Sequence, residues 1–311
     1  MNSRNISTVL VIGASGFVGR HAVAELLEKG YRVRCAARRP EAVADLAARG
    51  CEVVKADMTD AGSMVRALDS VDAVFVCVHT LLPQAGGTDS SPDFVETELE
   101  GLRNIVAGCR ANDVGRIVYV TFLGVRPDAE NAWTRGRWKA EQYLLDSGLD
   151  ATIFRPGMIV GDGGRGFGVL MSRARRPVAV LLGNGKRHFQ HIAVTDLAYY
   201  LVASLDQPET FGHAFDVGGD ETLSYNQMVD LAAGVLGRGR TVKLHFPRWP
   251  LTLAAPLLER ISRMPRGSLR AFLQGLDTDS VGDPRPIRRI LQRPPLTFAE
   301  AVKQAAGESG K

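Results

Sequence analysis

The sequence is poor in cysteine and in long apolar runs, and each shortage excludes a class of protein. Its 311 residues include four cysteines. They form no Cys-x-x-Cys pair and no spacing typical of a metal site, so we expect free thiols, no bound metal and a reducing compartment, the cytoplasm. No run is long enough to span a bilayer, and the polar stretch 1–7 does not resemble a signal peptide.

Neither sign of charge dominates the chain. Lysine and arginine number 38 against 34 acidic residues, which gives a formal net charge of +4. This balance gives no reason to expect a nucleic-acid partner. A content of 45% hydrophobic and 23% charged residues is ordinary for soluble proteins. The length suffices for one large domain or two modest ones with a full core.

A glycine-rich turn near the start is the most informative stretch. Residues 8–12, Thr-Val-Leu-Val-Ile, fit a strand buried on both faces of a parallel sheet. Gly13, Gly16 and Gly19 follow, and apolar residues then recur at helical spacing. This order predicts a dinucleotide site, because a pyrophosphate can approach the bare backbone and the helix N-terminus offers free N–H groups. Ser15 adds a hydroxyl donor, and a tight turn without a ligand is the alternative.

The next expected strand, 31–37, ends in Arg38 and Arg39. In a dinucleotide fold this end faces the adenosine ribose, where an acid binds the 2′-hydroxyl and an arginine accepts a 2′-phosphate. Two arginines and no acid favour NADP(H) over NAD(H), since a guanidinium binds phosphate through two donors. A solvated basic turn at Pro40 is the alternative.

Strands and helices alternate through the first half of the chain. Further strands are expected at 51–55, 71–78, 116–121 and 151–155. The alternation predicts an α/β fold with a doubly wound parallel sheet, the Rossmann arrangement.

We expect this domain to span 1–160, with a returning contribution from about 189–218. A smaller mixed α/β region, 161–311, would mostly bind the substrate or a partner. His79 follows the strand 71–78 at the edge where ligands bind, which makes it a candidate proton donor; a packed or solvated loop histidine is the alternative.

Basic and apolar residues gather in the second half. Arginines and lysines between 135 and 187 indicate either a plain basic surface or attraction of an anionic substrate or membrane. The segment 246–263 is apolar, contains a tryptophan and is flanked by arginines. It resembles a peripheral membrane contact or a lipophilic-substrate element. A core helix or an oligomer contact is the alternative, and its prolines argue against a long amphipathic helix.

Several stretches, in order, resemble the extended and atypical short-chain dehydrogenase/reductases. Within these families the sequence is most similar to the group around the NADPH-binding accessory subunit of respiratory complex I. The stretches are GASGFVG (13–19), ARRPE (37–41), KADMTD (55–60), EGLRNI (100–105), VYVTFLGV (118–125), WKAEQYL (138–144), FRPGMIVG (154–161), FQHIAVTDLA (189–198) and FDVGGDETLSY (215–225).

The resemblance implies a role for each of several residues. The pyrophosphate would be held by Gly13, Ser15, Gly16, Phe17 and Val18. The 2′-phosphate would be held by Arg38, with Arg39 as a second contact. Asp57 and Met58 would flank the adenine, and the stretch 76–79, with Val78, would pass beneath the ribose and nicotinamide.

The remaining implied roles concern the reaction. Lys139 would bind the nicotinamide ribose, and 155–157 would form the floor of the pocket. Active members carry Tyr-x-x-x-Lys, with the tyrosine as acid or base. Here Arg135 stands four residues before the lysine, and Thr121 keeps a hydroxyl where a partner serine is usual. The usual tyrosine relay is therefore absent, and an arginine does not give up its proton.

Two functions fit these observations. The first is an NADPH-dependent oxidoreductase that reduces a small hydrophobic carbonyl, quinone or enone, with Lys139, Thr121 and His79 as candidate catalytic residues. The second is a non-catalytic NADP(H)-binding sensor or an accessory or assembly protein, which would require a partner. A sugar-nucleotide epimerase or dehydratase is disfavoured, because those reactions depend on the missing tyrosine.

Overall fold

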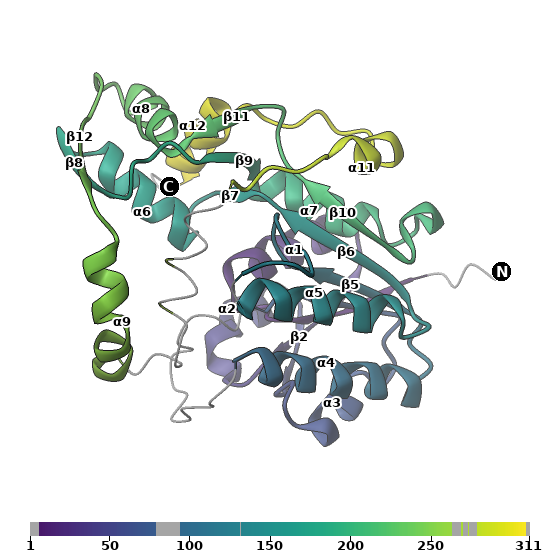
Figure 1. Ribbon diagram of the computed structural model, residues 1–311. Coiled ribbons are helices and arrows are strands. Elements are labelled where there is room, and N and C mark those ends of the chain that lie inside the picture. The colour runs from purple at the N-terminus through teal and green to yellow at the C-terminus, as the bar shows by residue number, and fades with distance from the viewer. Residues whose placement is uncertain are drawn as a thin grey trace.

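The computed structural model describes residues 6–78, 94–130, 132–262, 269, 273 and 279–308. Its centre is a seven-stranded parallel sheet with helices on both faces (Figure 1). The strand order across the sheet is β10 (His213–Val217), β6 (Asp150–Pro156), β5 (Arg116–Val120), β4 (Ala73–Val76), β1 (Thr8–Ile12), β2 (Arg32–Ala37) and β3 (Glu52–Lys55). The predicted doubly wound parallel sheet is confirmed.

Strand β1 shows why the sheet is buried on both faces. All five of its residues are buried, as the apolar run predicts. Val9 and Val11 belong to one core cluster, whereas Leu10 and Ile12 belong to the other, because successive side chains point to opposite faces of a strand. Each face therefore needs its own layer of helices.

The two helix layers cover these clusters. One layer contains α1 (Phe17–Glu28) and α7 (Val194–Ala203), which pack against each other. The other contains α3 (Ala61–Ala67), α4 (Phe94–Ala111) and α5 (Ala132–Leu145). The short elements η1 (Pro40–Val43) and α2 (Ala44–Ala48) connect β2 to β3.

The second half of the chain adds two small sheets and a third core cluster. One sheet joins β7 (Met158–Val160), β9 (His188–Ala193) and β11 (Thr222–Ser224). The other pairs β8 (Val178–Leu182) with β12 (Val242–Phe246). Besides α7, the helices described in this half are α6 (Arg165–Ala174), α8 (Tyr225–Val235), α9 (Trp249–Ile261), α11 (Arg285–Ile290) and α12 (Phe298–Glu308), with the short η2 (Pro208–Thr210).

The two halves exchange segments. Strand β10 comes from the second half of the sequence and pairs with β6 at the edge of the central sheet. Helix α7 likewise packs on α1. The expected division of the chain near residue 160 stays a prediction.

Candidate coenzyme and substrate site

The glycine turn joins β1 to α1 at the carboxyl edge of the sheet. Gly13 has φ +88°, and a Cβ there would lie 2.6 Å from the carbonyl oxygen of Cys77, just beyond β4. A Cβ on Gly19 would lie 2.2 Å from the carbonyl oxygen of Gly13, so the first turn of α1 packs directly on the loop. Both positions therefore require glycine for the backbone path itself.

Gly16 differs from the other two glycines of the turn. Its φ of −79° is open to any residue, and it is the N-cap of α1 without a capping side chain. A Cβ there would lie 3.2 Å from the carbonyl oxygen of Gly13, a tight but not impossible contact. The first turn of α1 also has no acidic residue. The helix N-terminus is thus left without a negative group of its own and can receive an anion.

The residues around this N-terminus differ in how open they are. Ser15 is exposed, whereas Phe17 and Val18 are partly buried. A Cβ added to Gly161 or Gly164 would lie 2.9 Å from the Phe17 ring. The loop after β7 thus lies against that ring, and what Phe17 offers an anion is its backbone N–H group.

Two further strand ends bring the other predicted coenzyme residues to the same edge. Arg38 and Arg39 directly follow β2 and are exposed, and within the described residues neither forms an ion pair. Asp57 follows β3, and its Oδ1 accepts hydrogen bonds from the Thr59 backbone N–H at 3.0 Å and hydroxyl at 2.9 Å. Because β1, β2 and β3 are neighbours and parallel, these groups line one edge of the sheet.

Met58 and Val78 have different neighbours. The side chain of Met58 lies close to Gly101 of α4, where a Cβ would be 2.0 Å from the methionine methyl carbon. Val78 follows β4, and its Cγ1 would be 3.3 Å from a Cβ on Gly13. Val78 therefore lies against the glycine turn. His79 and the rest of the loop 79–93 lie outside the described residues.

The residues that the sequence analysis connects with the reaction lie on α5 and directly after β5, and they differ in exposure. Thr121 is buried, and its hydroxyl donates to Glu141 Oε1 at 2.7 Å. Arg135 donates from Nη1 to the backbone oxygens of Ala129 and Glu130, each at 2.6 Å. Lys139 lies on the exposed side of α5. Its predicted contact with the ribose stays a prediction.

The inward side of α5 carries other residues. Trp133 stacks on Phe122 with a centroid distance of 4.2 Å, and Arg137, four residues later, is 2% exposed. These two positions have the Tyr-x-x-x-Lys spacing, yet neither is a tyrosine or a lysine. Tyr143, the one tyrosine of α5, lies farther along the helix and packs against the core beneath it.

A buried charged cluster, missed by sequence reasoning, surrounds the end of β5. Arg137 Nη1 lies 2.6 Å from Glu98 Oε1 and donates to the Tyr119 hydroxyl at 2.8 Å. The Tyr119 hydroxyl in turn donates to Glu98. Burial raises the pKa of Tyr119 well above its ordinary value. Burial, the largest single cause, acts to lower the pKa of Arg137, but Glu98, Tyr119 and Glu141 together outweigh it. The net shift is upward, so this arginine keeps its charge.

A second polar chain runs across the neighbouring strand ends. Glu141 is fully buried and accepts from Thr121 and from Arg155, whose Nε lies 3.0 Å from Oε2. Arg155 Nη1 lies 3.9 Å from Asp216 Oδ1 on β10. Burial raises the pKa of Asp216. The helical spacing of 137, 140, 141 and 144 could have revealed that two charged residues of α5 face inward.

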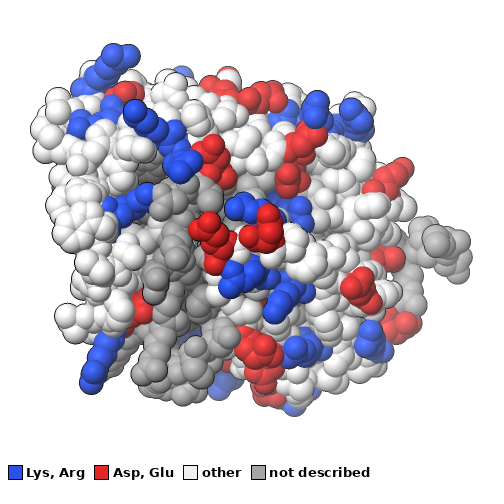
Figure 2. Space-filling view, in the orientation of Figure 1, with Lys and Arg blue, Asp and Glu red and all other residues white. Residues whose placement is uncertain are grey.

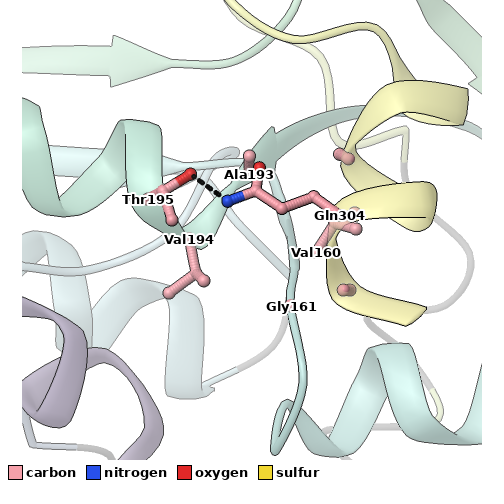
Figure 3. A pocket seen from close by; sticks show the side chains of 8 residues that line it. Val160, Gly161, Ala193, Val194, Thr195 and Gln304 are labelled. Carbon is pink, nitrogen blue, oxygen red and sulfur yellow. Dashed lines mark hydrogen bonds between the residues drawn. The ribbon is translucent and has the colours of Figure 1, made fainter. Parts of the chain in front are cut away.

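A small pocket lies apart from these residues (Figure 3). Its cavity volume is about 10 Å³, and Gln304 of α12 reaches across it to donate to the Thr195 hydroxyl at 3.5 Å. None of the predicted coenzyme residues lines it. It is too small for a dinucleotide, so the exposed sheet edge is the better candidate site.

A family described as NAD(P)H-binding matches residues 13–208, from the first glycine of the turn to beyond α7. The chain belongs to this NAD(P)H-binding family. The family fits the glycine turn, the uncapped helix N-terminus and the two arginines after β2. The resemblance predicted from the sequence motifs is confirmed, and the chain is an NAD(P)-binding Rossmann protein.

The relatives of this family member include a reductase and a subunit of a mitochondrial NADH dehydrogenase. The chain is 29% identical, over 88% of each sequence, to a (4-alkanoyl-5-oxo-2,5-dihydrofuran-3-yl)methyl phosphate reductase of Streptomyces griseus. It is 25% identical to the mitochondrial NADH dehydrogenase (ubiquinone) 1 alpha subcomplex subunit 9 of Arabidopsis thaliana, over 82% of this chain and 64% of that protein.

A solved structure supports the fold. The NADPH-dependent quinone oxidoreductase QOR2 of Escherichia coli, complexed with NADPH, superposes with a TM-score of 0.72 at 18% identity, covering 95% of this chain and 99% of that one. Among the described helices of this family member, none has the length and apolar character needed to cross a bilayer.

Proposed function

We propose that this protein is a reductase that uses NADPH to reduce a small hydrophobic carbonyl compound, quinone or enone. The observation that carries the proposal is the α1 N-terminus, which has neither a capping side chain nor an acid, beside two exposed arginines. A bound dinucleotide would satisfy both features, because its pyrophosphate and 2′-phosphate are anions. The NAD(P)H-binding family and the reductase relative support it.

The residues present fit such a coenzyme. Backbone N–H groups of the turn 13–18 would hold the pyrophosphate, with the Ser15 hydroxyl beside them. Arg38, with Arg39, would hold the 2′-phosphate. Asp57 and Met58 would flank the adenine, and Val78 would pass beneath the ribose. When bound, the nicotinamide supplies a hydride.

The chain's own residues limit how a proton can be delivered. The Thr121 hydroxyl directs its proton to Glu141, so it can accept a hydrogen bond from a substrate but not donate one while that bond persists. A guanidinium does not give up its proton, and Tyr143, the one tyrosine of α5, lies farther along the helix than Trp133 and Arg137. The substrate must therefore be one that needs little acid catalysis, or take its proton from water or His79. A quinone or an enone meets this condition better than a simple ketone.

Oxidation of NADPH in the presence of a panel of quinones, enones and ketones tests the proposal. The wild-type protein should oxidise NADPH with at least one quinone or enone and poorly with simple ketones. The matched control is Gly16→Ala, which keeps an allowed φ but fills the space that the pyrophosphate needs. A wild-type rate that matches this variant with every acceptor would refute a reductase.

The inward side of α5 also favours a second candidate, an NADP(H)-binding accessory protein without turnover. Trp133 and Arg137, on the inward side of α5, have the Tyr-x-x-x-Lys spacing without the tyrosine or the lysine, and Arg137 is paired with Glu98. The relationship to the Arabidopsis complex I subunit supports this candidate. It predicts NADPH binding without oxidation. Carbonyl reduction gained by Trp133→Tyr or by Arg135→Tyr would show that only the acid is missing.

A further inference from the structure

Exposed large apolar residues are concentrated on three neighbouring elements of the second half. Of the thirteen such residues in the described part of the chain, nine lie on β8, β12 and α9. We call these nine residues the lateral apolar surface. They are Val178, Val180, Val242, Leu244, Phe246, Trp249, Leu253, Leu257 and Ile261.

The two-stranded sheet contributes one apolar face. Its register pairs Val178 with Val242 and Val180 with Leu244, and all four side chains are exposed. The alternate residues of β8, Ala179 and Leu181, are buried on the other face. A strand with period two normally turns its polar side to water. In β8 both sides are apolar, and the outer face of the sheet has no cover within the described residues.

Helix α9 continues the surface with a stripe. Trp249, Leu253, Leu257 and Ile261 follow one another at intervals of four and are 65%, 74%, 61% and 69% exposed. Ala255, on another side of the helix, is buried against the rest of the protein. The prolines argue against a long amphipathic helix here, yet α9 extends for 13 residues with Pro256 inside it and an apolar stripe along one side. A helix of a globular protein normally packs its apolar stripe against the core, whereas the stripe of α9 is exposed.

The segments that carry the surface are strongly basic. Residues 175–187 and 237–262 contain nine lysines and arginines and one acid, Glu259. Glu259 is 5% exposed and accepts from the Leu269 backbone N–H at 2.8 Å. Because β8 and β12 are parallel, the arginines before each strand gather at one end, where Arg238 donates to the carbonyl of Arg175. In Figure 2 the flank over these elements is mostly white, with blue side chains at its margins.

We propose that the lateral apolar surface docks on the surface of an anionic lipid bilayer. Apolar residues with an exposed tryptophan would enter the headgroup boundary, and the cations around them would contact anionic lipids. A second copy of the chain fits worse, because a two-fold contact would place these cations opposite one another without exposed acids. The absence of a spanning helix from the described residues makes the attachment peripheral.

Co-sedimentation of the full chain with vesicles tests this proposal. Vesicles of phosphatidylcholine alone are compared with vesicles that contain about a quarter phosphatidylglycerol. The protein should sediment with the anionic vesicles, stay in solution with the neutral ones and dissociate when salt rises to about 0.5 M. Each cation near an anionic surface contributes about fivefold in affinity, so Arg240→Glu with Arg260→Glu should weaken binding at least 25-fold, about fivefold per charge. Arg66→Glu with Arg289→Glu, at exposed positions elsewhere, should not.

The apolar contribution has its own controls. Leu253→Ser with Leu257→Ser should abolish sedimentation, whereas Val65→Ser with Val281→Ser, on other surfaces, should leave it unchanged. Fluorescence of wild-type protein should shift to the blue with anionic vesicles, and Trp249→Phe should remove that shift. Two results would overturn the proposal. One is wild-type protein that does not sediment with anionic vesicles. The other is wild-type protein that is a dimer in solution and becomes a monomer on Leu253→Ser with Leu257→Ser.

Discussion

Arg137→Met should destabilise the protein strongly, because it breaks the buried cluster at the end of β5. Arg137 and Glu98 are 2% and 5% exposed and lie 2.6 Å apart. Removing one partner of a buried ion pair leaves the other charge without compensation, which costs about 3–5 kcal/mol. The Tyr119 hydroxyl also loses the donor that now lies at 2.8 Å. The loss of stability in Arg137→Met should therefore lie in the upper part of this range.

Thermal and urea unfolding measure this loss. With an unfolding entropy of about 2.1 cal/mol/K per residue, a chain of 311 residues loses about 6 °C in Tm for about 4 kcal/mol. The triple variant Glu98→Leu, Tyr119→Phe, Arg137→Met removes every charge of the cluster and should recover at least half of the loss, because no buried charge is stranded. A loss below about 1 kcal/mol for Arg137→Met, typical of an exposed pair, would refute the reasoning.

The remaining predictions concern the coenzyme turn and one histidine. Arg38→Ala should weaken NADPH binding about thirtyfold and leave NADH unchanged in calorimetric titrations, since one guanidinium near a phosphate of about −2 charge contributes about 2 kcal/mol in water. Gly16→Ala should weaken both coenzymes without changing Tm, whereas Gly19→Ala should lower stability by about 1–3 kcal/mol, because its Cβ would meet a backbone oxygen at 2.2 Å. Burial lowers the pKa of His191, so the unfolded chain binds its proton more readily. The free energy of unfolding of the wild-type protein should therefore fall as the pH drops from about 6.5, the pKa of the histidine in the unfolded chain, toward its lower pKa in the folded chain. Urea titrations of the His191→Asn variant over the same pH range should show a smaller fall. Equal acid sensitivity in both proteins would exclude His191 as a cause.

The central sheet could be predicted because its signals are local. The run 8–12 is apolar after Thr8, and such a run has few alternatives to a buried strand. The glycine turn likewise carries its own physical reason, since Gly13 and Gly19 have no room for a Cβ. The family resemblance then allowed individual residues to be assigned to parts of the coenzyme.

The second half and the charged clusters could not be predicted in the same way. Strands β8 and β12 pair across about sixty residues of sequence, and nothing local in either indicates its partner. Glu98 and Arg137 lie on helices, where a charged residue usually faces water, and their burial depends on each other and on Tyr119. The roles assigned to Lys139 and Thr121 came from family spacing, and the structure places one on the exposed side of α5 and bonds the other to Glu141.

The central claim is that main-chain amides at the first crossover and the arginines after β2 bind a phosphorylated pyridine dinucleotide. Isothermal titration calorimetry of the folded wild-type protein with NADPH and with NADH tests it most directly. Saturable binding of NADPH, clearly tighter than that of NADH, is the predicted result. Folded protein that takes up neither coenzyme would contradict it.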